Sequence, residues 1–253
     1  MNAIQFEKVS KTYRLHHENY QTITNQFNGW LHRLFGKNLT PLESDETFYA
    51  LKNVSLVIQE GEFVGILGAN GAGKTTLLRL IANITKPTRG CVSAKGRIAP
   101  LIEIGVGFHP ELTGRENIYL NGVILRMTKS EVQKKFDEIV SFSELEKFID
   151  CPIKQYSMGM LIRLGFSVAI HSDFDILLAD EILAVGDRHF QEKCLLKFEE
   201  MKRAKKTLIF ISHSIEQLKK YCENGFLFDH GTVVYSGKIE DVCNFYANQN
   251  RSF

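Results

Sequence analysis

The sequence has 253 residues, 44% of them hydrophobic, which is enough for a substantial core in one domain with lobes. Its 31 basic and 29 acidic residues nearly cancel, so the overall charge does not favour nucleic acid or an anionic membrane surface as a partner. The start of the sequence is not typical of a signal peptide, and no run of about 18 apolar residues predicts an ordinary transmembrane helix. The five cysteines are scattered and include no C-x-x-C pair, which fits a reducing compartment.

The first part of the chain predicts two strands separated by an insertion. Residues 4–13 and 48–58 have the composition of strands, and the second strand ends in a turn at Glu60-Gly61. Between them, residues 16–47 form a polar and aromatic segment in which hydrophobic residues recur near helical spacing. We therefore expect an amphipathic helix within this insertion.

A glycine-rich loop follows the apolar strand predicted at Phe63–Leu67 and precedes a helical pattern over residues 76–84. It has the full G-x-x-x-x-G-K-T pattern of a phosphate-binding loop, in the strand-to-helix context that this function requires. Backbone N–H groups and the N-terminus of the helix would bind phosphates, Lys74 would reach the β and γ phosphates, and the Thr75 hydroxyl would coordinate Mg²⁺. The candidate nucleotide-binding residues of this segment are Gly68, Ala69, Asn70, Gly71, Ala72, Gly73, Lys74, Thr75 and Thr76.

The middle of the chain is predicted to be helical. Helical patterns with alternating charge cover residues 117–148, and we interpret this region as a subdomain inserted between two halves of the core. The next helix, at 160–170, is preceded by Tyr-Ser-Met-Gly-Met, in which Ser157 can cap the helix and Gly159 permits close approach to the backbone. The start of this helix is therefore a second candidate anion site, although an ordinary helix cap would explain Ser157 alone.

Two consecutive carboxylates end the apolar strand predicted at 175–179. A parallel sheet would carry them at the same edge as the phosphate loop, where Asp180 suits Mg²⁺ coordination and Glu181 suits activation of an attacking water. A helix over 187–204, a strand over Thr207–Ile211 and a hairpin over 226–235 follow. This alternation of strands and helices predicts a largely parallel sheet.

Taken together, these segments resemble the ATP-binding cassette (ABC) ATPases over nearly all of residues 3–240. The resemblance implies an α/β fold: a P-loop NTPase with a mostly parallel core sheet, an antiparallel β subdomain and a helical subdomain. It implies one domain over 1–253, with the nucleotide-binding core and β subdomain at about 1–110 and 165–253, and the helical subdomain at about 111–164. The insertion at 16–47 would be a gate-like segment, or else a helix packed on the protein's own core.

The same resemblance assigns roles to further residues. Ser157 and Gly159 would contact the γ phosphate bound to the opposite subunit of a homodimer, and Tyr13 would stack on adenine. His213 would contact the γ phosphate and help to arrange the catalytic water. Glu103 stands where the family has a glutamine that coordinates Mg²⁺ and senses the membrane partner, and the Tyr-Ser-Met-Gly-Met segment departs from the family's Leu-Ser-Gly-Gly-Gln at three positions.

Four segments, taken as a set, resemble the ABC ATPases that export O-antigen, capsule or teichoic-acid polysaccharides: residues 103–117, the Tyr-Ser-Met-Gly-Met variant at 156–160, Leu-Ala-Val-Gly-Asp at 183–187, and the insertion before residue 48. The loop ending at Asp187 would communicate across the dimer interface. The resemblance implies that ATP and Mg²⁺ drive transport of a lipid-linked polysaccharide through a separate permease dimer, from a peripheral position on the cytoplasmic face of the inner membrane. No nucleic-acid partner is expected.

Two alternatives stay open from the sequence. One is a soluble ABC ATPase that acts on ribosomes or DNA, although such proteins typically carry two cassettes or long coiled-coil insertions, and neither is found here. The other is the ATPase of a nutrient importer, which the Glu103 segment and the early insertion disfavour. Some exporters carry a carbohydrate-recognition domain after the ATPase. The sequence stops at Phe253, soon after the last elements of the cassette, so either the natural protein lacks that domain, as capsule-type relatives do, or the sequence is truncated.

Overall fold

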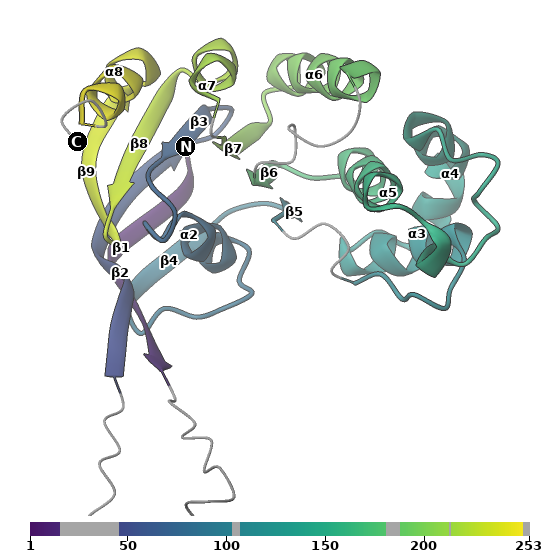
Figure 1. Cartoon of the computed structure of the whole chain (residues 1–253), viewed down its shortest axis with the longest axis horizontal. Helices are drawn as coiled ribbons and strands as arrows, with labels where there is room; N and C mark the ends of the chain where they lie inside the picture. The colour runs from purple at the N-terminus through teal and green to yellow at the C-terminus, as the bar shows by residue number, and fades with distance from the viewer. Residues whose placement is uncertain (16–45, 103–106, 181–187, 213, 250–253) are drawn as a thin grey trace, which may run out of the picture.

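The computed structural model describes residues 1–15, 46–102, 107–180, 188–212 and 214–249 (Figure 1). Residues 16–45, which make up nearly all of the predicted insertion, lie outside the described part, whereas residues 46 and 47 belong to the second strand. Among the described helices, none combines the length and the apolar character needed to cross a membrane.

A six-stranded sheet forms the centre of the molecule, in the order β5-β6-β7-β3-β8-β9. All neighbouring pairs are parallel except β8 and β9, which form the hairpin predicted from the sequence. Strands β3 and β7 are buried along their whole length, as expected for near-continuous apolar runs in a parallel sheet. The strands are β3 (Phe63–Leu67), β5 (Ile98–Leu101), β6 (Ile176–Asp180), β7 (Thr207–Ile211), β8 (Asn224–Asp229) and β9 (Thr232–Lys238). The predicted α/β fold with a mostly parallel sheet is confirmed.

A second, antiparallel sheet has the order β2-β1-β4. It consists of β1 (Asn2–Leu15), β2 (Glu46–Gln59) and β4 (Arg89–Ala94). The pairing of β1 with β2 places Tyr13 directly opposite Phe48, so their side chains lie on the same face of the sheet. This sheet supplies the antiparallel part of the predicted fold.

The α-helices form two groups (Figure 1): α3, α4 and α5 make a lobe beside the central sheet, and α2, α6, α7 and α8 pack nearer to it. Capping boxes start both α3 and α4, through Thr113 with Glu116 and Thr128 with Glu131, which divides the helical region predicted at 117–148 into two helices. The helical elements are α2 (Lys74–Ile81), α3 (Gly114–Ile124), α4 (Lys129–Ser143), η1 (Ile153–Gln155), α5 (Met158–His171), α6 (Arg188–Arg203), α7 (Ile215–Tyr221) and α8 (Ile239–Gln249).

Helix α5 takes part in two hydrophobic cores. Leu164 and Val168 belong to the cluster inside the helical lobe, whereas Ile162, Phe166 and Ile170 belong to the cluster between the central sheet and its covering helices. The predicted subdomain boundary near residue 164 therefore falls within a continuous helix. Consequently, the start of α5 and the core of the molecule are joined by one rigid element.

Candidate functional site

The phosphate loop connects β3 to α2 through a backbone that requires glycine. Gly68 and Gly73 have φ angles of 146° and 101°, which side chains rarely tolerate. A Cβ added at Gly73 would lie 2.4 Å from the backbone oxygen of Ala50 in β2. The glycines of the predicted motif thus allow the loop to turn tightly between the two sheets and to direct the start of α2 at a ligand.

Lys74 is the first residue of α2, and its side chain folds back over the loop. Although it is charged, it is only 8% exposed, and Nζ donates hydrogen bonds to the backbone oxygens of Gly68 at 2.7 Å and Ala69 at 2.9 Å. A buried ammonium group needs such partners because burial without them is costly. The carbonyls hold the positive charge beside the start of α2, where a phosphate would bind.

Thr75 and Asp180 come from separate elements and meet at the carboxyl edge of the central sheet. The Thr75 hydroxyl donates a hydrogen bond to Oδ2 of Asp180 at 3.1 Å, and β6 and β3 are separated in the sheet only by β7. Hydroxyl and carboxylate oxygens are the protein ligands that Mg²⁺ prefers, usually together with substrate phosphates and water. Within the described residues, no three His, Cys, Asp or Glu side chains gather into a metal site of their own.

A cavity of about 500 Å³ opens over the phosphate loop and contains most of the predicted nucleotide-binding residues. The predicted residues that line it are Tyr13, Asn70, Gly71, Gly73, Lys74, Thr75, Thr76 and Asp180. Gly68, Ala69 and Ala72 belong to the loop but do not line the cavity. The carbonyls of Gly68 and Ala69 accept the hydrogen bonds from Lys74, and Ala72 is buried in a hydrophobic cluster.

Three lining residues were not predicted from the sequence: Phe48, Ala50 and Ile102. Phe48 stacks on Tyr13, with ring centroids 5.8 Å apart and an angle of 28° between the planes. The two stacked rings form an aromatic wall of the cavity. The available signal was the aromatic pair Phe48-Tyr49 at the start of the second predicted strand, but pairing across the insertion could not be read from spacing alone.

Ser157 and Gly159 lie at the start of α5 and do not line this cavity. Ser157 is the N-cap, and its Oγ accepts a hydrogen bond from the backbone N–H of Met160 at 3.3 Å. A Cβ added at Gly159 would meet only Ser157 Oγ, at 3.8 Å, so the helix start is open. One chain therefore does not bring these residues together with its own phosphate loop.

Tyr156 anchors the segment that leads into α5. Its hydroxyl donates a hydrogen bond to the backbone oxygen of Phe148 at 2.6 Å, and burial raises the pKa of Tyr156 to about 12. Gly114, at the start of α3, leaves room for this hydroxyl, since a Cβ there would lie 2.3 Å from it. The tyrosine that replaces the leucine of the family motif thus has a specific place in the helical lobe.

Three predicted site residues, Glu103, Glu181 and His213, lie outside the described residues, as does Asp187. Their roles stay predictions. Asp180 and Ile102, which precede two of them in the chain, both line the cavity over the phosphate loop.

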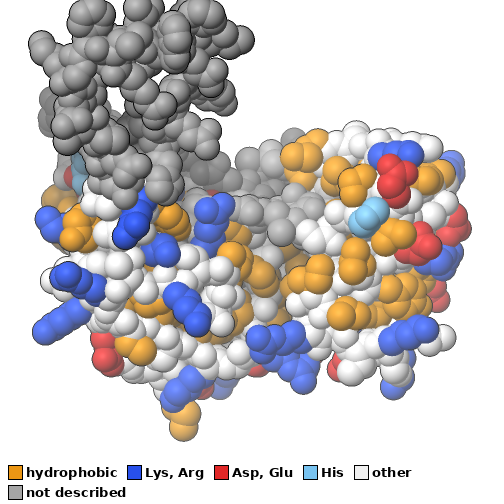
Figure 2. Space-filling model, turned by 90° about the horizontal axis from the view of Figure 1, so that it is seen from below, with side chains coloured by type: hydrophobic (Ala, Val, Ile, Leu, Met, Phe, Trp, Pro, Cys, Tyr) orange, Lys and Arg blue, Asp and Glu red, His pale blue; other side chains and the backbone are white. Residues whose placement is uncertain are grey.

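A second cavity, of about 680 Å³, lies between α2 and β4 on one side and α3 on the other. Figure 2 shows hydrophobic side chains on this face of the molecule, and Ile84, Val123 and Ile124 in this region are more than half exposed. Ile102 lines both this groove and the cavity over the phosphate loop. The two cavities therefore share a wall.

Comparison with known proteins identifies the family. The ABC transporter family model matches residues 51–184. The O-antigen export system ATP-binding protein RfbB of Klebsiella pneumoniae is 41% identical over 96% of this chain and 97% of its own length. RfbB of Myxococcus xanthus is 44% identical over 97% of this chain, and the teichoic acids export ATP-binding protein TagH of Bacillus anthracis is 40% identical over 96% of it. The chain spans only 56% and 42%, respectively, of the lengths of these two relatives.

Solved structures support the same assignment. A dimeric ATP-binding cassette in a post-hydrolysis state, bound to ADP and Pi, matches with a TM-score of 0.73 and 26% identity, and the match covers 93% of this chain and 98% of that one. A second dimeric cassette, from a bacterial ABC transporter, matches with a TM-score of 0.70 and 25% identity over the same shares. The phosphate loop, the paired Thr75 and Asp180, and these similarities over almost the whole length lead to one conclusion: the chain belongs to the ABC transporter family and is an ATPase of the cassette type.

Proposed function

We propose that this chain is the ATP-hydrolysing subunit of an exporter that moves a lipid-linked polysaccharide across the cytoplasmic membrane through a separate permease. The observation that carries the ATPase site is the contact between Thr75 and Asp180 beside Lys74, in a cavity that opens over the phosphate loop. The names of the O-antigen and teichoic acid export relatives support the substrate class, particularly the Klebsiella relative of nearly equal length.

The residues of the cavity suit an Mg·ATP ligand. Loop N–H groups and Lys74 would bind the phosphates, and Tyr13 with Phe48 would contact adenine. Thr75 and Asp180 would hold Mg²⁺, with Glu103 as a further candidate ligand. The ion would supply positive charge that stabilises the phosphate oxygens during hydrolysis.

The remaining roles concern the attacking water. Glu181 would position it and accept its proton, and His213 would contact the γ phosphate. Both residues follow buried strands, β6 and β7, that are neighbours in the central sheet. Adjacent parallel strands end at the same edge, so this order supports a shared site for the two residues.

A homodimer would complete each ATP site. Ser157 and Gly159 lie at an open helix N-terminus away from their own chain's cavity, which suits contact with a phosphate held by the partner subunit. Both subunits would contribute the same two surfaces, as a two-fold dimer requires. The dimeric cassettes among the structural relatives support this arrangement.

The groove between α2 and α3 is the surface that we assign to the permease. It exposes apolar side chains, and its wall at Ile102 is shared with the nucleotide cavity, so a partner seated there would touch a residue that lines the ATP site. This contact would hold the chain at the cytoplasmic face of the inner membrane.

The test is ATP hydrolysis by the purified chain, alone and with its permease in lipid vesicles. Glu181→Gln should retain ATP binding and lose nearly all turnover, Lys74→Ala should weaken ATP binding, and Ile124→Glu should lose only the stimulation by the permease. Full turnover by Glu181→Gln would refute the catalytic assignment. Stimulation by ribosomes or DNA, without any effect of a membrane protein, would refute the export function and favour a soluble ABC ATPase.

A further inference from the structure

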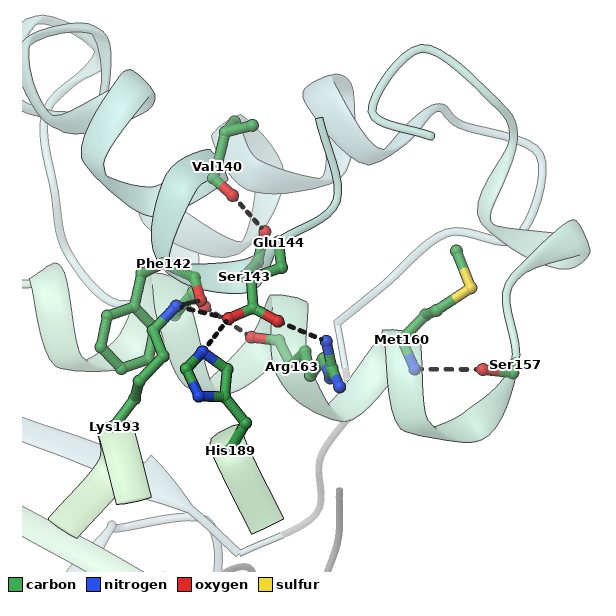
Figure 3. Close-up of polar contacts among 10 residues, drawn as sticks. Val140, Phe142, Ser143, Glu144, Ser157, Met160, Arg163, His189 and Lys193 are labelled. Carbon is green, nitrogen blue, oxygen red and sulfur yellow. Dashed lines mark hydrogen bonds and ion pairs between the residues drawn. The ribbon is translucent and has the colours of Figure 1, made fainter. Parts of the chain in front are cut away.

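Glu144 accepts contacts from an arginine, a lysine and a histidine at the end of α4 (Figure 3). Its Oε2 accepts a hydrogen bond from Arg163 at 2.9 Å, and its Oε1 accepts one from Lys193 at 2.9 Å. His189 Nε2 lies 3.3 Å from the same Oε1. Glu144 itself is the C-cap of α4 and has a φ angle of 58°, a left-handed conformation that non-glycine residues adopt infrequently.

These contacts join three separate helices. Glu144 caps α4, Arg163 lies in α5, and Lys193 lies in α6, where its Nζ also donates a hydrogen bond to the backbone oxygen of Phe142 at 2.8 Å. The aromatic ring of Phe142 packs against Phe166 of α5, with centroids 6.1 Å apart, and against Phe190 of α6, with centroids 5.7 Å apart. A polar and an aromatic contact therefore fix the same three-helix junction.

The ion pairs that Glu144 makes with Arg163 and Lys193 are enclosed, whereas the His189 side chain at the same junction is 72% exposed. The side chains of Glu144, Arg163 and Lys193 are 31%, 18% and 25% exposed. In the ion pair between Arg115 and Asp150 the side chains are 47% and 69% exposed. Solvent screens the enclosed charges less, so their interaction is stronger than that of an ordinary surface pair.

The charge on Glu144 is stable at neutral pH. The hydrogen bond from Lys193 lowers the pKa of the Glu144 carboxyl most. Burial, the next largest effect, raises this pKa, and the charges of Lys193, Arg163 and His189 lower it by smaller amounts, so that the net shift is downward. With a pKa below the usual value of a glutamate, the carboxylate is an anion at neutral pH, and its contacts with Arg163 and Lys193 are charge-assisted.

Helices α5 and α6 each begin next to residues with a proposed role in ATP hydrolysis: α5 follows Ser157, and α6 follows the segment that contains Glu181. Arg163 lies six residues after Ser157, which is about 9 Å along α5. Lys193 lies in α6, whose first residue directly follows residues 181–187 in the chain. A tie between α5 and α6 therefore limits how far the start of α5 can shift relative to the start of α6.

We propose that Glu144 is a positioning residue for ATP hydrolysis, which holds α5 and α6 in the relative placement that a closed, two-chain ATP site requires. It touches neither nucleotide nor water, and it acts through Arg163 and Lys193. This inference rests on the proposed function, because it takes the start of α5 to contact ATP on the partner subunit.

The test compares Glu144→Gln with Asp150→Asn in steady-state ATP hydrolysis. Each substitution removes one carboxylate charge from the helical lobe, but only the first removes a tie between α5 and α6. We expect Glu144→Gln to lower kcat about tenfold and to change KM for ATP less than twofold, since hydrogen bonds to charged groups have strengths in this range. Asp150→Asn should stay within twofold of the wild type in both constants.

A double-mutant cycle identifies the route of the effect. Lys193→Met keeps the aliphatic stem and removes the charge, so it should lower kcat to a similar extent. If Glu144 acts through Lys193, the double variant should be about as slow as the slower single variant. A general loss of stability would produce neither the non-additive losses of this cycle nor a fall in kcat at nearly constant KM. Thermal midpoints measured for each variant show that it is folded at the assay temperature.

Three results would overturn the proposal: kcat of Glu144→Gln within twofold of that of Asp150→Asn, losses that multiply in the double variant, or a change confined to KM. If Glu144→Gln does not fold, the kcat of Lys193→Met alone decides by the same limits.

The Glu181→Gln variant separates failure of this inference about Glu144 from failure of the proposed function. If Glu181→Gln turns over ATP like the wild type, the ATP site itself is wrongly assigned, whereas an inactive Glu181→Gln beside a normal Glu144→Gln removes only the role of Glu144.

Discussion

The contact between Gly114 and Tyr156 gives a quantitative prediction for the helical lobe. In Gly114→Ala, the new methyl group would lie 2.3 Å from the Tyr156 hydroxyl and 3.1 Å from both the side chain and the backbone oxygen of Ile149. Tyr156 is only 8% exposed, so its ring has little room to move away. The substitution must therefore displace the ring and break its hydrogen bond to Phe148.

The cost has two parts. Overpacking a well-filled site costs about 1–3 kcal/mol of folding free energy. Loss of the Tyr156 hydrogen bond adds about 1 kcal/mol, at the low end for a buried group, because the Phe148 oxygen still accepts a hydrogen bond from the Cys151 N–H at 2.9 Å. We expect Gly114→Ala to destabilise the protein by about 2–4 kcal/mol and Tyr156→Phe by about 1 kcal/mol.

Urea denaturation of the two single variants and the double variant measures these terms. Without the Tyr156 hydroxyl, the methyl group introduced at position 114 has more space, so the double variant should be more stable than the sum of the single losses by about 1 kcal/mol or more. Additive losses would refute the steric argument. A Gly114→Ala variant within about 0.5 kcal/mol of the wild type would refute the close contact itself.

Three further outcomes follow from the structure. Phe48→Ala should raise KM for ATP about fivefold through loss of the aromatic wall, whereas Tyr49→Ala, its exposed neighbour outside the cavity, should leave KM unchanged. The pKa of Tyr156 is about 12 in the folded protein and about 10 in the unfolded chain, so its contribution to stability is complete below pH 10 and is lost between pH 10 and 12. Urea denaturation at several pH values should therefore show the free energy of unfolding falling more steeply over this range in the wild type than in Tyr156→Phe. Among the thiols, alkylation followed by mass spectrometry should modify the exposed Cys91 first and the buried Cys194, whose pKa burial raises to about 12, only on unfolding.

The parts of the fold that could be predicted were those with a local physical cause. Strands β3 and β7 appear in the sequence as short, fully apolar runs, and both are buried along their whole length. The phosphate loop has a pattern in which each glycine has a steric purpose, so its place between β3 and α2 followed directly. Strand β4, by contrast, is mostly exposed at an edge of its sheet and has no apolar run, and it was not predicted.

The parts of the site that could not be predicted depend on contacts between distant residues. Phe48 reaches the cavity only because β2 pairs with β1 across the insertion. The cluster at Glu144 joins residues 49 positions apart in the case of Lys193, and no spacing rule connects the end of one helix with a residue in another. Cys91 is exposed, unlike the buried Cys194, Cys222 and Cys243, because it lies in the edge strand β4.

Helix α5 shows that a signal can be present in a sequence without revealing its structural meaning. Ile162, Phe166 and Ile170 are four residues apart and form one stripe, and Leu164 and Val168 form another. A shift of two residues turns the helix by about 200°, so the stripes lie on opposite faces and each enters a different core. A helix that is apolar on opposite faces must be covered on both.

Because α5 is held in this way from Ile162 onward, the cap at Ser157 cannot reorient alone, and any movement of the proposed phosphate contact has to carry the helical lobe with it. Contacts such as that between Glu144 and Lys193, at the edge of the lobe, are therefore where such movement would be controlled.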